Sequence, residues 1–202
     1  QQIDERVIAA ALNRSKKLAD AGQPTVLTIN VSSRSVGMEM AEYAISTGTE
    51  LGVNPFDIIF EITETATQRS GGHAATFVNH LNDAGYRVAI DDFGSGTTSL
   101  KQIRTLPFHM LKLDESLVLT LAKDAHDREF AKAICGLAHA IGLDVIAEFV
   151  EDEETMKFLG EIGVKYAQGY HLGKPEPFPL DPEQLGATHD SAYHHPAFVA
   201  TP

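Results

Sequence analysis

The chain has 202 residues, of which 28 are acidic and 16 basic, and its net charge is −12. This acidic balance excludes a DNA- or RNA-binding surface of the ordinary kind, because contact with a nucleic-acid polymer needs a basic stripe. A single cysteine excludes a disulfide scaffold, and no apolar run has the length of a membrane span, so we expect a cytoplasmic domain.

Short apolar, β-branched segments alternate along the chain with amphipathic segments of helical spacing. An opening helix, carried by Ile3, Val7 and Leu12, precedes six predicted strands. The strands are residues 25–30, 57–61, 86–91, 109–113, 144–148 and 165–168. Five helices are expected to end at a glycine, which accepts the left-handed conformation that closes a helix. These glycines are Gly22, Gly52, Gly85, Gly142 and Gly163.

Strands that alternate with helices predict an α/β fold with a parallel sheet covered by helices. About six βα units after a leading helix predict a TIM-like (β/α)8 barrel whose first strands are absent, since a complete barrel has eight. An open doubly wound sheet is the structural alternative. The proline-rich segment from Pro175 onward predicts an extended tail. Its histidines, His189, His194 and His195, do not define a metal site, because nothing fixes their geometry.

Each predicted strand is apolar until its C-terminal end, where polar residues follow. Ligands bind at the carboxyl ends of the strands both in barrels and in open α/β sheets. Carboxylate and amide oxygens suit Mg²⁺ or Mn²⁺, and a pair of such ions can hold both oxygens of an in-line phosphoryl displacement. The polar residues at the strand ends are Asn30, Glu61, Asp91 with Asp92, Lys112 with Asp114, Glu148 and Gln168.

Each of these residues also has an ordinary structural interpretation. Asp91 and Asp92 can simply begin the turn before Gly94, and the strand must end between them if both are to face one site. Lys112 is either a snorkelling edge residue or a buried cation that faces the acids. The combination favours a metal site. If these were ordinary turn residues, there would be no reason for side chains able to bind a metal to end several consecutive strands.

Six segments of the chain occur in an order and spacing that resemble the EAL family of cyclic di-GMP phosphodiesterases. They are Asn30-Val31-Ser32, Glu61-Ile62-Thr63-Glu64, Asp91-Asp92-Phe93-Gly94-Ser95-Gly96, Lys112-Leu113-Asp114, Ala147-Glu148-Phe149-Val150-Glu151 and Gln168-Gly169-Tyr170. The resemblance covers residues 1–180 as an EAL phosphodiesterase domain, incomplete at its N-terminus. Residues 181–202 remain as a C-terminal tail.

The resemblance implies a TIM-like barrel of the EAL type that cuts cyclic di-GMP to linear pGpG with two Mg²⁺ or Mn²⁺ ions. Asn30 and Glu61 would bind one metal, and Asp91 would bridge both. Asp92 and Glu148 would bind the second metal.

The remaining site residues carry supporting roles in the resemblance. Lys112 would orient the attacking water, and Glu151 and Gln168 would support the site. Lys112, Glu148 and Glu151 are thus the expected catalytic residues. Glu64 would anchor the loop over residues 92–100, which in the family couples dimerisation to metal binding. Gly94, Ser95, Asp114 and Gln168 would support the substrate or this loop. A homodimer and a fused or partner sensor or cyclase domain are expected, and a nucleic-acid polymer is not.

Three departures from the family pattern matter. The chain contains no Glu-Ala-Leu sequence, although that glutamate is a metal ligand in the family. We interpret this as a missing upstream segment, because a barrel short of two strands would expose its core and two unpaired edges. Phe149 replaces a glycine that is usual between Glu148 and Val150, and Thr97-Thr98 replaces a tyrosine followed by serine.

Two other functions remain open at this point. A degenerate, non-catalytic receptor would bind cyclic di-GMP and signal to a partner, and the missing glutamate favours it. An unrelated metal-dependent barrel enzyme would act on a carbonyl substrate. The retained Asp91, Asp92, Lys112 and Glu148 favour the hydrolase, because a receptor has less need of metal ligands.

Overall fold

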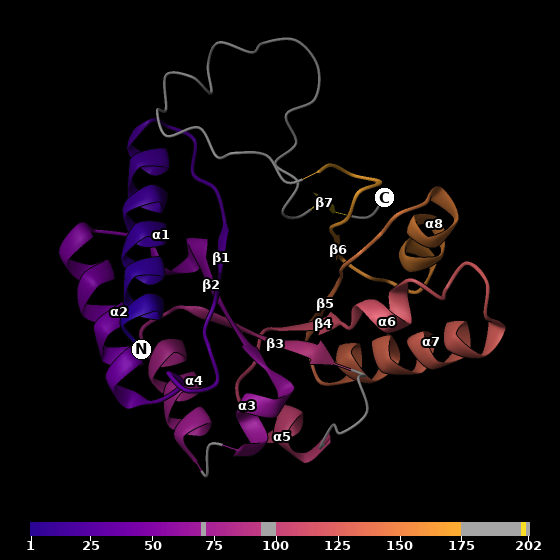
Figure 1. Ribbon diagram of the computed structural model, residues 1–202, viewed down its shortest axis with the longest axis horizontal. Helices are drawn as coiled ribbons and strands as arrows, with labels where there is room; N and C mark the ends of the chain where they lie inside the picture. Colours follow the sequence, from indigo (N-terminus) through magenta and orange to yellow (C-terminus); the bar gives the residue numbers. More distant parts are fainter. Residues whose placement is uncertain (70–71, 94–99, 175–198, 201–202) are drawn as a thin grey trace. The chain divides into compact units, whose positions relative to one another are not determined.

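The computed structural model describes residues 1–69, 72–93, 100–174 and 199–200. The chain forms two compact units, Gln1–Lys112 and Leu113–Pro202. Both units are built from helices that alternate with strands (Figure 1). The glycine and serine at positions 94 and 95, the threonines at 97 and 98, and residues 175–198 of the tail lie outside the described residues.

The first unit holds β1, β2, β3 and all of β4 but its last residue, in the order β1-β2-β3-β4. The pairs β1–β2 and β2–β3 are parallel, and the amide of His109, just before β4, donates to Val88 O of β3 at 2.9 Å. Helix α1 packs beside α2, and α2 beside α4 (Figure 1). The elements are α1 (Gln2–Asp20), β1 (Leu27–Asn30), α2 (Met38–Leu51), a 3₁₀ turn (Pro55–Asp57), β2 (Ile58–Thr63), α3 (Glu64–Arg69), α4 (His73–Asp83), β3 (Arg87–Phe93), α5 (Leu100–Thr105) and β4 (Met110–Leu113).

The two faces of strand β2 have different roles. Phe60 is fully buried and forms a T-shaped contact with the Phe77 ring of α4, with ring centroids 6.2 Å apart, so this face belongs to the core under the helices. Successive side chains of a strand point to opposite faces, so Glu61 projects from the other face. Glu61 pairs in register with Asn30 of β1 and Ala89 of β3. Asp91, two residues after Ala89, therefore shares the face of Glu61.

The second unit pairs β5 with β6 in parallel and packs α7 against β5. The buried face of α7 includes Ile134 and Cys135, so this cysteine is a core residue. Its burial raises the pKa of the thiol to about 12. Asp124 and Asp152 begin α7 and α8 by accepting hydrogen bonds from backbone amides. The elements are α6 (Glu115–Val118), α7 (Ala125–Ala140), β5 (Asp144–Ala147), α8 (Glu153–Glu161), β6 (Tyr166–Ala167) and the short β7 (Val199–Ala200).

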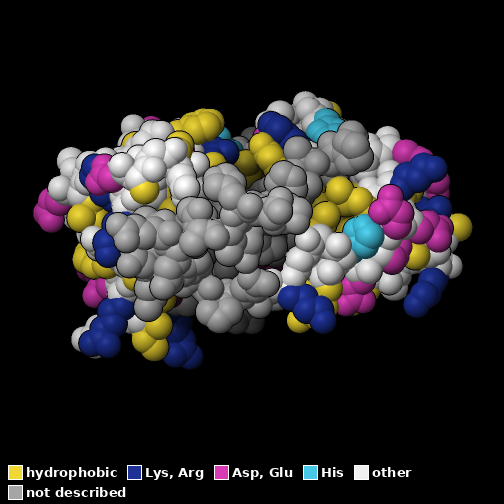
Figure 2. Space-filling view, turned by 90° about the horizontal axis from the view of Figure 1, so that it is seen from above, with side chains coloured by type: hydrophobic (Ala, Val, Ile, Leu, Met, Phe, Trp, Pro, Cys, Tyr) yellow, Lys and Arg dark blue, Asp and Glu magenta, His cyan; other side chains and the backbone are white. Residues whose placement is uncertain are grey.

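The surface of the second unit carries charges of both signs next to one another (right side of Figure 2). Arg128 of α7 binds Glu154 of α8 at 2.6 Å, and Lys165 binds Asp144 at 2.8 Å. Such exposed pairs each add at most about 1 kcal/mol to stability, so they fix local side-chain positions more than they hold the unit together. None of the described helices is long and apolar enough to cross a bilayer.

The six predicted strands all occur, each within three residues of its expected ends. The five predicted helix-ending glycines all have a positive φ. One expectation was wrong in detail, because β3 does not end between Asp91 and Asp92 but continues to Phe93. The regular strand geometry is instead interrupted by Asp92 itself, which has a φ of +58°.

Candidate active site

Three buried charged side chains meet in the first unit. The Lys112 ammonium donates to Glu61 Oε2 at 2.7 Å and lies 3.1 Å from Asp91 Oδ1. Glu61 and Lys112 are each 3% exposed and Asp91 is 9% exposed. Lys112 is therefore the buried cation that faces the acids, rather than a snorkelling edge residue.

Burial determines how the charges of Glu61, Asp91 and Lys112 affect one another. Burial raises the pKa of the Glu61 carboxyl above its ordinary value, and the nearby Asp91 carboxylate adds to that effect. The Lys112 ammonium and a hydrogen bond from Thr28 act in the opposite direction without cancelling it. One cation thus compensates two carboxylates in a poorly solvated place, which leaves an excess of negative charge suited to a further cation.

Asn30 and Asp92 flank this group but are exposed. Asn30 ends β1 opposite Glu61, and the amide of the next residue, Val31, donates to Glu61 O at 2.9 Å. The amide of Asp92 donates to Asp91 Oδ1 at 3.0 Å, and Asp92 has a left-handed backbone conformation. Asp91 is buried and Asp92 is exposed. The structure thus brings together Glu61, Asp91 and Lys112. It places Asn30 at the end of the neighbouring strand β1 and Asp92 next to Asp91 on β3.

The second unit contributes a separate pair. Glu148 follows β5 and Gln168 follows β6, and the Gln168 side-chain amide donates to Glu148 Oε1. The segments that directly follow β5 and β6, called strand exits below, are also joined by their backbones, since Val150 N donates to Gln168 O at 3.0 Å. A Cβ at Gly169 would stand 2.2 Å from both the N and the O of Val150, so only glycine fits there.

Phe149 has an unusual backbone conformation for an aromatic residue. Its φ is +54°, in the left-handed region that bulky residues avoid, and its side chain is 45% exposed. The flanking Val150 is fully buried and bonded through both its amide and its carbonyl, to Gln168 and His171. The surrounding structure therefore imposes the strained conformation at this site.

Replacement of Phe149 by glycine is expected to stabilise the chain by up to about 1 kcal/mol. Glycine removes a left-handed penalty of about 1–2 kcal/mol, offset in part by the greater entropy of glycine in the unfolded chain. The measurement is the urea midpoint of Phe149→Gly beside Phe149→Ala, which loses the ring but keeps the strain. A glycine variant no more stable than the alanine variant would contradict the assignment of strain.

The other predicted residues have distinct places. Glu64 is buried at the start of α3, whereas Glu151 is exposed between β5 and α8. Asp114 is the N-cap of α6 and accepts a hydrogen bond from Ser116 N at 2.9 Å. The predicted Gly94 and Ser95 lie outside the described residues.

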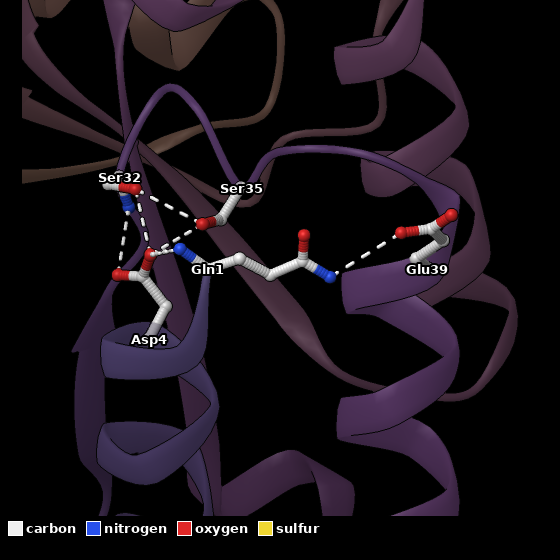
Figure 3. A network of polar contacts seen from close by, with 5 residues as sticks. All are labelled: Gln1, Asp4, Ser32, Ser35 and Glu39. Carbon is white, nitrogen blue, oxygen red and sulfur yellow. Dashed lines mark hydrogen bonds and ion pairs between the residues drawn. The ribbon is translucent and has the colours of Figure 1, made fainter.

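Sequence reasoning did not find a polar network between Asp4 of α1 and the residues that follow β1 (Figure 3). Asp4, in the first turn of α1, accepts hydrogen bonds from Ser32 Oγ at 2.8 Å and Ser35 Oγ at 2.5 Å. Although burial by itself raises the pKa of the Asp4 carboxyl, these hydrogen bonds hold it below its ordinary value. An acidic residue in a first helical turn is common, so the sequence held no signal for this contact.

The chemistry of the donor set fits a hard divalent cation. Asn30, Glu61, Asp91 and Asp92 supply only oxygen atoms, as does Glu148. Among the residues that the structure describes, no group of three or more histidines, cysteines, aspartates or glutamates is gathered for metal binding. In the first unit, the Lys112 ammonium takes the place between Glu61 and Asp91.

The comparisons with known proteins decide the family. The EAL domain model matches residues 1–175. The chain belongs to the EAL domain family. It is 34% identical over 185 residues to "Cyclic di-GMP phosphodiesterase PdeB" of Shewanella oneidensis, covering 91% of this chain and 22% of PdeB. It is 32% identical to "Cyclic di-GMP phosphodiesterase RocR" of Pseudomonas aeruginosa, covering 85% of this chain and 44% of RocR.

This EAL chain therefore spans less than half the length of these two curated relatives. Among solved structures, it resembles the "PaMucR Phosphodiesterase, c-di-GMP complex" with a TM-score of 0.82 and 30% identity, over 91% of this chain and 74% of that one. The crystal structure of the EAL domain of Mycobacterium smegmatis DcpA matches with a TM-score of 0.74 and 33% identity, over 85% of this chain and 76% of that one. The expected fold class, the TIM-like α/β fold of EAL domains, is confirmed.

Proposed function

We propose that the chain is a catalytic domain that hydrolyses one phosphodiester of cyclic di-GMP to give linear pGpG, in a reaction that depends on Mg²⁺ or Mn²⁺. The observation that carries this proposal is the buried group of Glu61, Asp91 and Lys112 at the strand ends of an EAL domain. The names of the relatives, which are cyclic di-GMP phosphodiesterases, support the substrate and the reaction.

In this proposal, the side chains that offer oxygen atoms bind two metal ions. We assign Asn30 and Glu61 to one ion, Asp91 to both, and Asp92 and Glu148 to the second. When bound, a divalent ion supplies Lewis-acid stabilisation of the phosphoryl oxygens and lowers the pKa of water. Other residues of the chain hold these carboxylates in position before any ion binds.

The chain's own residues orient and balance these charges. Lys112 holds Glu61 and Asp91 at fixed distances and offsets part of their charge while the site is assembled. We retain its further role in orienting the attacking water as part of the proposal. Gln168 fixes one oxygen of Glu148 by its amide. The supporting role of Glu151 stays part of the proposal. The homodimer, the partner domains and a cytoplasmic location stay predictions.

The test is hydrolysis of cyclic di-GMP by the purified chain with Mn²⁺, with the linear product separated by chromatography. We expect pGpG to form, to disappear when a chelator is added, and to return when excess Mn²⁺ is restored. Product that forms equally well in chelator would contradict the metal dependence.

The same assay separates the hydrolase from the receptor. Cyclic di-GMP that binds the chain, measured by calorimetry, but stays intact with either Mg²⁺ or Mn²⁺ would identify a non-catalytic receptor. Neither binding nor hydrolysis would reject cyclic di-GMP as the ligand of this chain.

A further inference from the structure

The strand exit after Asn30 is held from two sides. On one side, the β1–β2 pairing continues beyond Asn30, because Val31 N donates to Glu61 O at 2.9 Å. On the other side, Ser32, two residues after Asn30, is bound by Asp4 of α1 (Figure 3). Val31 between them is buried, with 4% of its surface exposed. The backbone that carries the Asn30 side chain thus has little freedom.

Asp4 binds the loop that follows β1, residues 31–36, through both of its carboxylate oxygens. Oδ2 accepts from Ser32 Oγ at 2.8 Å and from Ser35 Oγ at 2.5 Å, and Oδ1 lies 3.4 Å from Ser32 N. The two hydroxyls are 3.2 Å apart, and Ser35 N donates to Ser32 O at 2.9 Å to close the turn. Hydrogen bonds to an ionised acceptor are about twice as strong as neutral ones, so Asp4 is the centre of this loop.

The loop is also connected to the next strand end. Ser33 Oγ lies 3.4 Å from Thr63 Oγ1, at the end of β2, two residues after Glu61. A shift of the loop would therefore disturb the exits of both β1 and β2. These strand ends carry Asn30 and Glu61, the two residues assigned to one metal ion.

We propose that Asp4 is a positioning residue that sets the geometry of Asn30, and with it the divalent-cation affinity of this strand-end site, through Ser32 and Ser35. This inference rests on the proposed function, because it takes Asn30 as a metal ligand. Asp4 itself is not a ligand in this proposal. Outer-shell residues that orient metal ligands change metal affinity by about 10–100-fold when they are removed.

The chain provides a matched control for Asp4. Glu5 is the neighbouring acid in the same first turn of α1, so both residues interact alike with the helix dipole. Glu5 is exposed, and of these two acids only Asp4 accepts hydrogen bonds from Ser32 and Ser35 in the described part of the chain. Asp4→Ala and Glu5→Ala thus remove the same charge from the same helix end, and only the first variant removes the loop contacts.

The experiment measures Mn²⁺ binding to the full chain by the electron paramagnetic resonance signal of free Mn²⁺, without substrate. We expect Asp4→Ala to raise the Mn²⁺ dissociation constant about tenfold, Asp4→Asn to have a smaller effect, and Glu5→Ala to match the unaltered chain. In the Ser32→Ala/Ser35→Ala background, Asp4→Ala should have little further effect, because both hydroxyl contacts are already lost and only the 3.4 Å contact with the amide of residue 32 remains. Ser35→Ala alone provides a milder variant should Asp4→Ala fail to fold.

The outcomes separate this inference from the proposed function. Mn²⁺ bound equally well by Asp4→Ala, Ser35→Ala and Glu5→Ala would overturn the positioning role while leaving the hydrolase proposal in place. No Mn²⁺ binding by the unaltered chain would overturn both. Binding that weakens only in the Asp4 and serine variants would support the positioning role, even if the hydrolysis assay showed no product.

Discussion

Replacement of Asp91 by asparagine is expected to lower kcat/KM for cyclic di-GMP by at least about 100-fold. Loss of an outer-shell partner of a metal costs about 10–100-fold, and Asp91 is proposed as a ligand that bridges two ions. The asparagine keeps the size of the side chain but removes the charge that faces Lys112 at 3.1 Å. The measurement is the rate of pGpG formation with saturating Mn²⁺, together with circular dichroism to check the fold.

Asp83→Asn is the matched control for this prediction. Asp83 is an exposed aspartate at the end of α4 in the same unit, so the substitution makes the same change in charge and volume. We expect the control to keep the activity of the unaltered chain. An Asp91→Asn variant that is equally active would rule out Asp91 as a metal ligand.

Replacement of Lys112 by methionine is expected to lower the free energy of unfolding by about 3–5 kcal/mol at pH 8 in the presence of chelator. Removal of one partner of a buried ion pair leaves an uncompensated buried charge, and here two carboxylates are left. The loss is a large part of the stability of an ordinary domain, so the urea midpoint should fall strongly. Adding Glu61→Gln to this variant should restore part of the loss.

The same variant gives a pH prediction with a definite sign. Burial already raises the pKa of Glu61 in the folded chain, and loss of the Lys112 cation should raise it further. A carboxyl with a raised folded pKa contributes most stability below its unfolded pKa of about 4.3 and loses that contribution as the pH rises through the folded pKa. The stability deficit of Lys112→Met relative to the unaltered chain should therefore shrink as the pH falls from 8 towards 5.

Lys16→Met provides the comparison at an exposed ion pair. Lys16 binds Asp20 within α1, and both side chains are at least one-third exposed. Such pairs add at most about 1 kcal/mol, so this variant should be close to the unaltered chain at both pH values. A Lys112→Met variant that unfolds like Lys16→Met would show that the buried group does not depend on its cation.

The strand positions and the polar strand ends could be predicted because each depends on local pattern. Apolar runs such as residues 57–61 and the glycines that end helices need no knowledge of distant contacts. The carboxyl ends of parallel strands are also where ligands bind, so the sequence pattern predicts Glu61, Asp91 and Lys112 as members of one site. The choice between a snorkelling and a buried Lys112 needed the structure, because both interpretations place the same residue on the same strand.

The remaining features arise from tertiary contacts that no local pattern encodes. Asp4 and Ser32 are 28 residues apart in sequence, and only the packing of α1 beside β1 brings them together. The left-handed conformation of Asp92 was missed for a related reason, since neighbouring aspartates in a strand were expected to require the strand's end. Here Asp92 takes a left-handed backbone conformation while the strand continues to Phe93.

The close approach of Gly169 to Val150 has a consequence for protein engineering. The two strand exits of the second unit touch backbone to backbone, so residues 148–150 and 169 form one indivisible module although nearly 20 residues separate them. A chimera that exchanged one of these two segments and kept the other would have to reproduce the close backbone contact between residues 150 and 169 with segments from different parents. Recombination of this unit with that of another EAL domain should therefore carry both exits from the same parent.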